Sequence, residues 1–161
     1  MAAQKRGEVR KDVQSIYSLR LKKFDTERFT PIKNCYPRNK PIGGLWASEV
    51  DARYSWKKWC EINEFHVERN TEDNCFRFQI AKTAKILTLS CEDDVKELPQ
   101  LGAKDVCGHK PDFEAIMAMG YDAIDYRLSD DTSICGDLYY ALYGWDCDSI
   151  LILNKNVIIP I

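Results

Sequence analysis

Two acids placed directly before a strongly apolar run are the feature of this sequence that most constrains its fold. The run at 149–153 has the length and composition of a buried strand. Asp146 and Asp148 precede it with a spacing of two, so an extended backbone turns both carboxylates to one face. Burying two carboxylates at the end of a strand costs free energy unless they are paired with cations, are hydrated or take part in binding or catalysis. The sequence therefore predicts a functional site here.

Short strands and helices are predicted along the rest of the chain. Alternating or compact apolar runs predict strands at 16–21, 45–48, 76–80, 86–89, 121–126, 149–153 and 157–159. Helices are predicted at 49–65, 92–98 and 111–120, whereas 138–143 fits either a helix or a strand. Mostly antiparallel strands with helices early and in the middle indicate an α+β sandwich. Residues 1–13 are predicted to form a polar arm, and 14–161 a single domain.

Composition narrows the class of protein. The 161 residues are 45% apolar and carry a formal net charge of −2, which is typical of a globular domain and gives no global field for nucleic acid or membrane. No apolar stretch approaches the roughly twenty residues that span a bilayer, and the first twelve residues are too polar for a signal peptide. We therefore expect a cytoplasmic protein with no membrane partner. The first forty residues are basic, which fits either a solvated face or attraction of a phosphate-bearing ligand.

Cysteine usage bears on redox state and on metals. Seven cysteines at irregular spacing fit no complete disulfide framework and predict reduced thiols. Cys107 and His109 lie close together, with Cys91 and Cys135 elsewhere. A structural zinc site usually contains a Cys-x-x-Cys pair, and none occurs here, so no metal site is predicted.

Three segments, in order along the chain, resemble the signature elements of the ADP-ribosyltransferase fold, which includes diphtheria-toxin-like and cholera-toxin-like toxins and poly(ADP-ribose) polymerases. Residues 16–20 are similar to the opening strand of that family, and 44–48 with the aromatic-rich helix that follows resemble its nicotinamide-lining strand and helix. Residues 146–152 are similar to the acid-x-acid before its catalytic strand, and 120–124 look like its Gly-Tyr-Asp-Gly-Ile strand. The resemblance implies an antiparallel β-sandwich core with flanking helices.

The resemblance also implies a mono-ADP-ribosyltransferase, which uses NAD as a substrate and transfers ADP-ribose to a macromolecular acceptor, protein or nucleic acid. Asp148 would be the ribose-facing acid that stabilises the oxocarbenium-like transition state, and Asp146 would orient the incoming acceptor. Trp46 would be the wall of the cleft that stacks on the nicotinamide ring, and Ser48 a hydroxyl partner of the acid. Hydrolysis of NAD is a subsidiary possibility.

The sequence departs from the family's pattern at two positions. Ser18 stands where the family has His or Arg, so Arg20 would supply the cation from the same face of the first strand. Asp148 stands where the usual acid is Glu, and it is one methylene shorter. These departures indicate either a divergent branch with shifted roles or a domain that has kept the fold without the reaction.

The alternative is therefore a non-catalytic binding or inhibitor protein, for example an anti-defence protein of a phage or mobile element. In that interpretation aromatic side chains near the C-terminus form an interface, namely Tyr139, Tyr140, Tyr143 and Trp145. The candidate residues also have structural interpretations. Asp146 would cap a turn, Asp148 would pair with Arg20 or a lysine, and Trp56, Trp59 and Trp145 would belong to the core.

Overall fold

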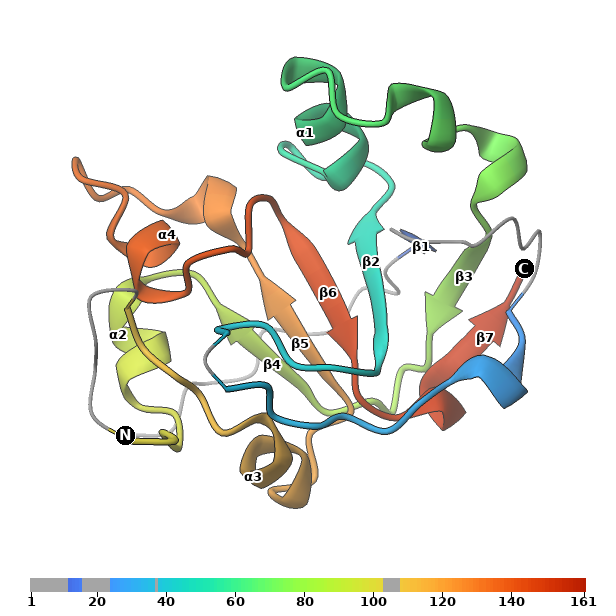
Figure 1. Cartoon of the computed structure of the whole chain (residues 1–161). Helices are drawn as coiled ribbons and strands as arrows, with labels where there is room; N and C mark the ends of the chain where they lie inside the picture. Colours follow the sequence, from blue (N-terminus) through green and yellow to red (C-terminus); the bar gives the residue numbers. More distant parts are fainter. Residues whose placement is uncertain (1–11, 16–23, 37, 103–107) are drawn as a thin grey trace.

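The computed structural model describes residues 12–15, 24–36, 38–102 and 108–161, which form a mixed α and β fold (Figure 1). Its strands are β1 (Asp12–Ser15), β2 (Leu45–Glu49), β3 (Arg77–Ile80), β4 (Ile86–Leu89), β5 (Ala123–Tyr126), β6 (Ser149–Ile152) and β7 (Ile158–Pro160). They lie in the order β4-β5-β6-β2-β1-β3-β7. Every pair in this order is antiparallel except β4–β5, which is parallel. This arrangement agrees with the predicted α+β class.

The described helices are short. They are α1 (Trp56–Ile62), α2 (Glu92–Lys96), α3 (Phe113–Ala118) and α4 (Asp137–Ala141). Single 3₁₀ turns are η1 (Thr26–Arg28), η2 (Val67–Arg69), η3 (Glu72–Asn74), η4 (Leu128–Asp130) and η5 (Lys155–Val157). Local capping sets the helix starts: Ser55 accepts the amide of Lys58 at the start of α1, and Asp112 accepts that of Ala115 at the start of α3.

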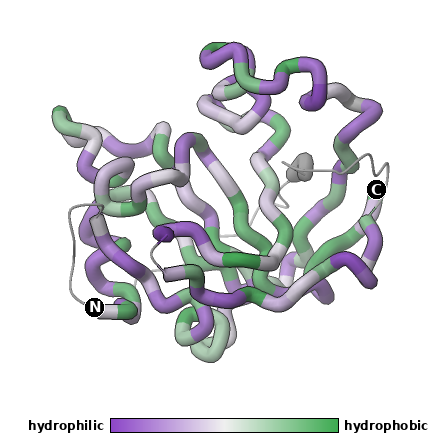
Figure 2. The backbone as a smooth tube through the Cα atoms, in the orientation of Figure 1, coloured by the Kyte–Doolittle hydropathy of each residue, from purple (hydrophilic) through white to green (hydrophobic). Residues whose placement is uncertain are grey.

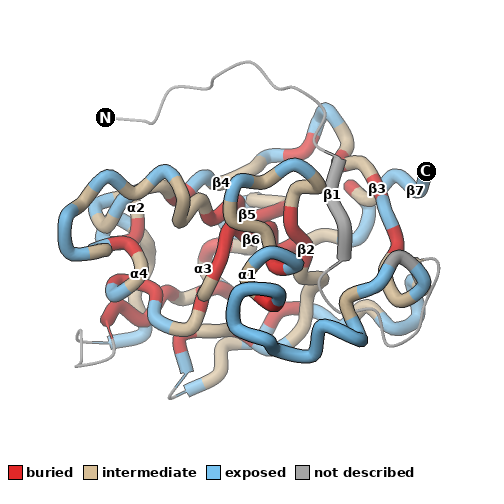
Figure 3. Tube along the Cα trace, turned by 90° about the horizontal axis from the view of Figure 1, so that it is seen from above, coloured by how far each residue is buried: buried red, intermediate tan, exposed pale blue. Residues whose placement is uncertain are grey.

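The two main clusters of the core lie on opposite faces of the sheet. Alternate residues of a strand point to opposite faces, and Ile124 and Leu151 belong to one cluster whereas Ile150 and Ile152 belong to the other. Residues of α2, α3 and α4 pack into the first cluster, so these helices cover that face. Figure 2 shows apolar residues concentrated along the central strands, and Figure 3 shows the same strands as the most buried part of the chain.

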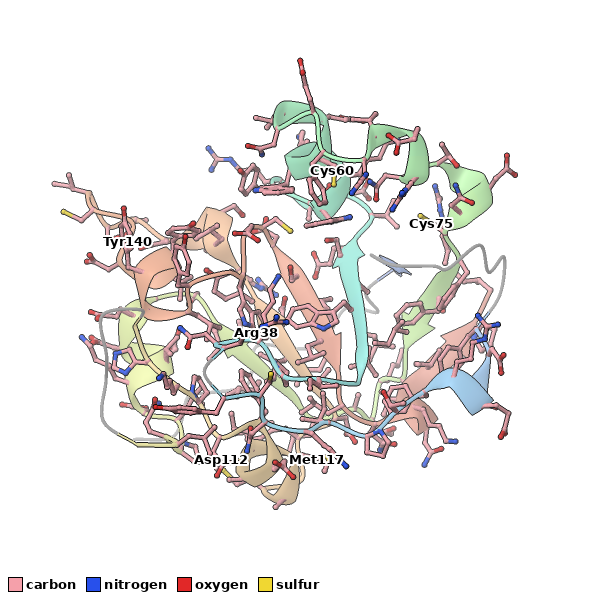
Figure 4. All side chains as sticks on the ribbon, viewed as in Figure 1. Arg38, Cys60, Cys75, Asp112, Met117 and Tyr140 are labelled. Atoms are coloured by element: carbon pink, nitrogen blue, oxygen red, sulfur yellow. The ribbon has the colours of Figure 1, made fainter. Side chains whose placement is uncertain are left out.

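A separate lobe follows β2. It consists of α1, η2 and η3 (residues 56–74, the α1 lobe) and lies beyond the end of β2 in Figure 1. Trp56 and Cys60 are buried with Cys147, and this small third cluster attaches the lobe to the chain that leads into β6. Figure 4 shows Cys60 inside the lobe.

The loop before β2 approaches other backbone closely at its paired glycines. Gly43 has φ of +86°, and a Cβ atom there would lie 2.2 Å from the carbonyl oxygen of Pro31. The amide of Gly44 donates to Thr30 at 2.8 Å, and Lys33 and Ile42 form an antiparallel bridge. The absence of side chains at these two glycines therefore permits the close backbone approach.

Several predicted boundaries shift. The helix predicted at 49–65 is limited to α1, because Ser55 caps its start and Glu64 adopts a left-handed conformation with φ of 51° after its end. The helix predicted from Pro111 begins at Phe113, because Asp112 is the capping residue. The ambiguous segment 138–143 contributes to a helix, α4.

One other predicted strand agrees with the structure, and another falls outside the described residues. The prediction of a strand at 86–89 is confirmed by β4. The predicted strand at 16–21 lies outside the described residues, and β1 precedes it, beginning within the last two residues of the predicted arm. In the part of the chain that the structure describes, no helix has the length and apolar character needed to cross a membrane.

Candidate functional site

The sheet brings the predicted site segments together. β6, β2 and β1 are consecutive neighbours, so the chain carrying Asp146 and Asp148 lies beside the strand carrying Trp46 and Ser48. Trp46 pairs in register with Leu151 of β6. Ser18 and Arg20, the expected contribution of the first strand, lie outside the described residues.

Asp148 is buried, with 8% of its surface exposed, and its carboxylate accepts three hydrogen bonds. Ser129 donates its amide to Oδ1 at 2.8 Å and its hydroxyl to Oδ2 at 2.7 Å. Tyr54 donates its amide to Oδ2 at 3.1 Å, while the amide of Asp148 donates to the carbonyl of Tyr54 at 2.9 Å. Asp148 therefore joins three chain segments: the loop after β2, the η4 turn and the entry to β6.

Ser48 takes part in the same junction through backbone groups. Its hydroxyl donates to the carbonyl oxygen of Asp148 at 2.9 Å and accepts the amide of Trp56 at 3.0 Å. Ser48 and Asp148 are thus in contact. The contact involves the main-chain carbonyl of Asp148, and the Asp148 carboxylate is held by Ser129 and Tyr54 instead.

Asp146 lies in a different environment. Its side chain is 28% exposed, and Lys40 Nζ lies 3.9 Å from its Oδ2. The same Nζ lies 5.2 Å from the centre of the half-buried Trp46 ring. Trp46, Lys40 and Asp146 therefore place an aromatic face, a cation and a carboxylate next to one another, and we call these three residues the Trp46 site.

Further aromatic rings support the Trp46 site from beneath. Trp145 is fully buried and meets Trp46 edge-on at 4.5 Å and Tyr126 at 5.4 Å between ring centres. The indole nitrogen of Trp145 donates to the carbonyl of Asn39 at 2.9 Å, which fixes the loop that carries Lys40. In Figure 4 the labelled Arg38 of this loop lies in front of the central strands. Trp145 therefore belongs to the core, as its structural interpretation predicts, and the interface cluster of the alternative is wrong for this residue.

The tyrosines of that cluster are arranged differently. Tyr140 and Tyr143 are 62% and 52% exposed, and both contact Tyr139 edge-on, at 5.3 and 5.5 Å. Figure 4 shows Tyr140 on α4. Trp56 is buried, as the core interpretation predicts, and it stacks on Trp59 at 5.0 Å within the α1 lobe.

Burial is the largest influence on the pKa of Lys40, in the Trp46 site, and of Cys147, which follows Asp146 in the chain. It lowers the pKa of Lys40 below its usual range, although the neighbouring Asp146 opposes this effect. Burial also raises the pKa of Cys147 to about 11, so this thiol is protonated at neutral pH and is not a nucleophile. The charged chemistry available is therefore that of Lys40 and Asp146.

Sequence reasoning missed Lys40, Ser129 and Tyr54. Lys40 lies in a loop and Ser129 in the single 3₁₀ turn η4, where no periodicity marks them, and Tyr54 contributes backbone groups that any residue has. Across the described ranges, no group of three or more His, Cys, Asp or Glu side chains is placed to hold a metal ion. Cys107 lies outside those ranges.

The chain matches no protein-family model, no curated protein and no solved structure.

Proposed function

We propose that this protein binds NAD at the Trp46 site and transfers ADP-ribose to a macromolecular acceptor. The proposal includes the fold, in which the sheet is the core of an ADP-ribosyltransferase-like sandwich. The observation that carries it is the juxtaposition of Trp46, Lys40 and Asp146, drawn from three segments of the chain. Each group suits one part of the dinucleotide.

The three side chains would contact different parts of NAD. The indole of Trp46 packs against the flat nicotinamide ring. Lys40 attracts the diphosphate, and Asp146 faces the ribose that develops positive charge. As the glycosidic bond between the ribose C1′ and nicotinamide breaks, nicotinamide leaves with the bonding electrons. A nucleophile of the acceptor then bonds to C1′ and releases its proton.

The two acids divide their roles in this proposal. The carboxylate of Asp148 accepts three hydrogen bonds within the protein and is nearly sealed from solvent, so we assign it the task of positioning the loops. Asp146 is more accessible, and among the described residues its carboxylate has a single long contact, to Lys40, so its oxygens are better placed to meet a ligand. We therefore take Asp146 as the catalytic carboxylate in place of Asp148.

Asparagine substitutions test the assignment because they keep shape and remove charge. The purified protein is incubated with NAD labelled in the adenylate moiety and with a crude bacterial lysate, and both nicotinamide release and label transfer are measured. Asp146→Asn is expected to abolish both with unchanged thermal stability. Asp137→Asn, an exposed residue of α4, is the matched control and should retain activity. Wild-type protein that neither binds NAD nor releases nicotinamide would refute the proposal.

A second function has an observation of its own. Tyr139 contacts both Tyr140 and Tyr143, which are more than half exposed, and the three rings resemble the aromatic anchors of a protein interface. A non-catalytic binding protein would use this surface and would be indifferent to NAD. A Tyr140→Ala and Tyr143→Ala double variant that loses a captured partner, in a protein that does not bind NAD, would favour this second function.

A further inference from the structure

A loop beside the Trp46 site concentrates positive charge. Residues 28–48 contain no acid but include Arg28, Lys33, Arg38 and Lys40, in a chain whose formal net charge is −2. We call residues 33–36 and 38–42 the basic loop. Lys33 and Arg38 (the latter labelled in Figure 4) are exposed, and neither takes part in an ion pair with another described residue. Their charges are therefore available to an anionic ligand.

Hydrogen bonds hold the backbone of the basic loop in place. Lys33 and Ile42 exchange bonds between their amide and carbonyl groups, each at 2.8 Å. The side chain of Asn34 donates to Asp112 at the start of α3, also at 2.8 Å, and the indole of Trp145 holds the other arm of the loop. The exposed cations thus stand on a fixed support, which lowers the entropy that a ligand must lose on binding.

Aromatic rings accompany these cations. Tyr36, in the turn of the basic loop, is 73% exposed, and Lys110 Nζ lies 4.3 Å from the centre of its ring. Lys40 Nζ lies in a similar way 5.2 Å from the centre of the Trp46 ring. Arg38 comes between Tyr36 and Lys40 along the chain. The loop therefore places an exposed aromatic ring next to several positive charges.

This combination defines the chemistry of a fitting ligand. Arginine and lysine bind phosphate groups, and an exposed aromatic ring stacks on a nucleic-acid base. A single strand offers both its phosphates and the faces of its bases, whereas a duplex keeps its bases stacked inside. An acidic peptide offers negative charge but no flat ring for Tyr36. Single-stranded nucleic acid is therefore the ligand that uses both features of the loop.

We propose that the basic loop binds single-stranded nucleic acid, with phosphates beside Lys33 and Arg38 and a base stacked on Tyr36. The attraction is local, because the protein as a whole carries a small negative charge. Binding is therefore strongest at low salt. The inference goes beyond the proposed function and does not depend on NAD, because these three residues lie outside the Trp46 site.

Fluorescence anisotropy with two labelled strands tests the inference. Oligothymidylate and oligouridylate of about twelve nucleotides are titrated with each protein at several salt concentrations. The proteins are wild type, Tyr36→Ala, Arg38→Gln and Arg69→Gln, and the thermal unfolding of each is measured in parallel. Arg69, an exposed arginine of the α1 lobe, is the matched control for loss of one positive charge.

Both variants of the basic loop should bind the strands more weakly and unfold at the same temperature as wild type. We expect Tyr36→Ala to weaken binding about tenfold, because it removes the stacking ring. Arg38→Gln should weaken binding about fivefold and reduce the slope of log affinity against log salt by about 0.7, the effect of one lost phosphate contact on a single strand. Arg69→Gln should bind as wild type does.

The other outcomes are equally decisive. Wild-type protein that binds neither strand at low salt would overturn the inference, and so would equal affinity of wild type and both loop variants. Polyglutamate that displaces the labelled strand as well as an unlabelled strand does would overturn it in favour of an acidic protein partner. Binding of one strand alone would support it and identify DNA or RNA as the source. The proposed function, which is tested by NAD turnover, stands or falls separately.

Discussion

Ser129 donates both its backbone amide and its hydroxyl to the carboxylate of Asp148, at 2.8 and 2.7 Å. This double contact fixes the η4 turn, which follows β5, to the chain that enters β6. Hydrogen bonds to a charged acceptor are stronger than those between neutral groups, particularly where water is excluded. Asp148, which the resemblance places at the position of the catalytic acid, is thus also the residue that holds these chain segments together.

Asp148→Ala should therefore lower the free energy of unfolding by roughly 3 kcal/mol, because it leaves the donors of Ser129 and Tyr54 without an acceptor. Asp146→Ala removes a long, partly exposed ion pair with Lys40 and should cost less than about 1 kcal/mol. Urea denaturation followed by tryptophan fluorescence measures both. Equal destabilisation by the two variants would contradict the division of roles between these acids.

Trp46→Leu should raise the dissociation constant for NAD about tenfold, because leucine keeps apolar volume but offers no ring face for stacking. Trp59→Leu, which alters the α1 lobe, is the matched control and should leave NAD binding unchanged. Calorimetric titration gives both constants. If the two variants bound NAD as tightly as wild type, Trp46 would be only a core residue.

Asp112→Ala should lower the free energy of unfolding at neutral pH by about 1 kcal/mol, because it removes the cap of α3. The Ala115 amide and the Asn34 side chain hold the pKa of Asp112 below its usual value in the folded protein. A depressed folded pKa gives stability that is present above the unfolded value, near 4, and is lost as pH falls through the folded value. The difference between variant and wild type should therefore shrink below about pH 4.

Denaturation series at several pH values check this dependence. Asp51→Ala, at an exposed position, provides a control that should match wild type throughout. A difference for Asp112→Ala that stays constant down to the lowest pH would show that the carboxylate charge contributes nothing to the cap.

Gly43→Ala should destabilise the protein by roughly 3 kcal/mol, because the added methyl group would overlap the carbonyl of Pro31 and the backbone is left-handed there. Gly120→Ala separates the two effects. Gly120 has φ of +82° but open space around a Cβ atom, so its variant should cost only about 1 kcal/mol. Equal losses would show that backbone conformation alone determines the cost at Gly43.

Local sequence patterns were sufficient for much of the fold. β4 coincides with the apolar run predicted at 86–89, and β6 coincides with the run predicted at 149–153 to within one residue. Short buried segments rich in β-branched residues favour the extended conformation of a strand. The end of α1 could not be predicted from the spacing of apolar residues. The hydrophobic period continues past Ile62, but the left-handed backbone at Glu64 and His66 ends the helix.

The candidate site was predicted less completely than the fold. A contact between Ser48 and Asp148 was expected only from the resemblance, whereas the donors to the Asp148 carboxylate are two main-chain amides, of Tyr54 and Ser129, and the hydroxyl of Ser129. Such contacts depend on tertiary packing and leave no periodic signal. The burial of Trp145 likewise depends on the loop at Asn39, which lies 106 residues away along the chain.

The neighbouring position of β2 and β6 in the sheet also has a consequence for how the chain is made. Ser48 and Asp148, which meet at this junction, are 100 residues apart. A ribosome adds about 5–20 residues each second, so β2 leaves it roughly 5–20 s before its partner strand exists. Throughout that interval one edge of β2 offers unpaired amide and carbonyl groups to any other extended chain nearby. Newly made copies are most vulnerable to aggregation in this window, and slow synthesis lengthens it.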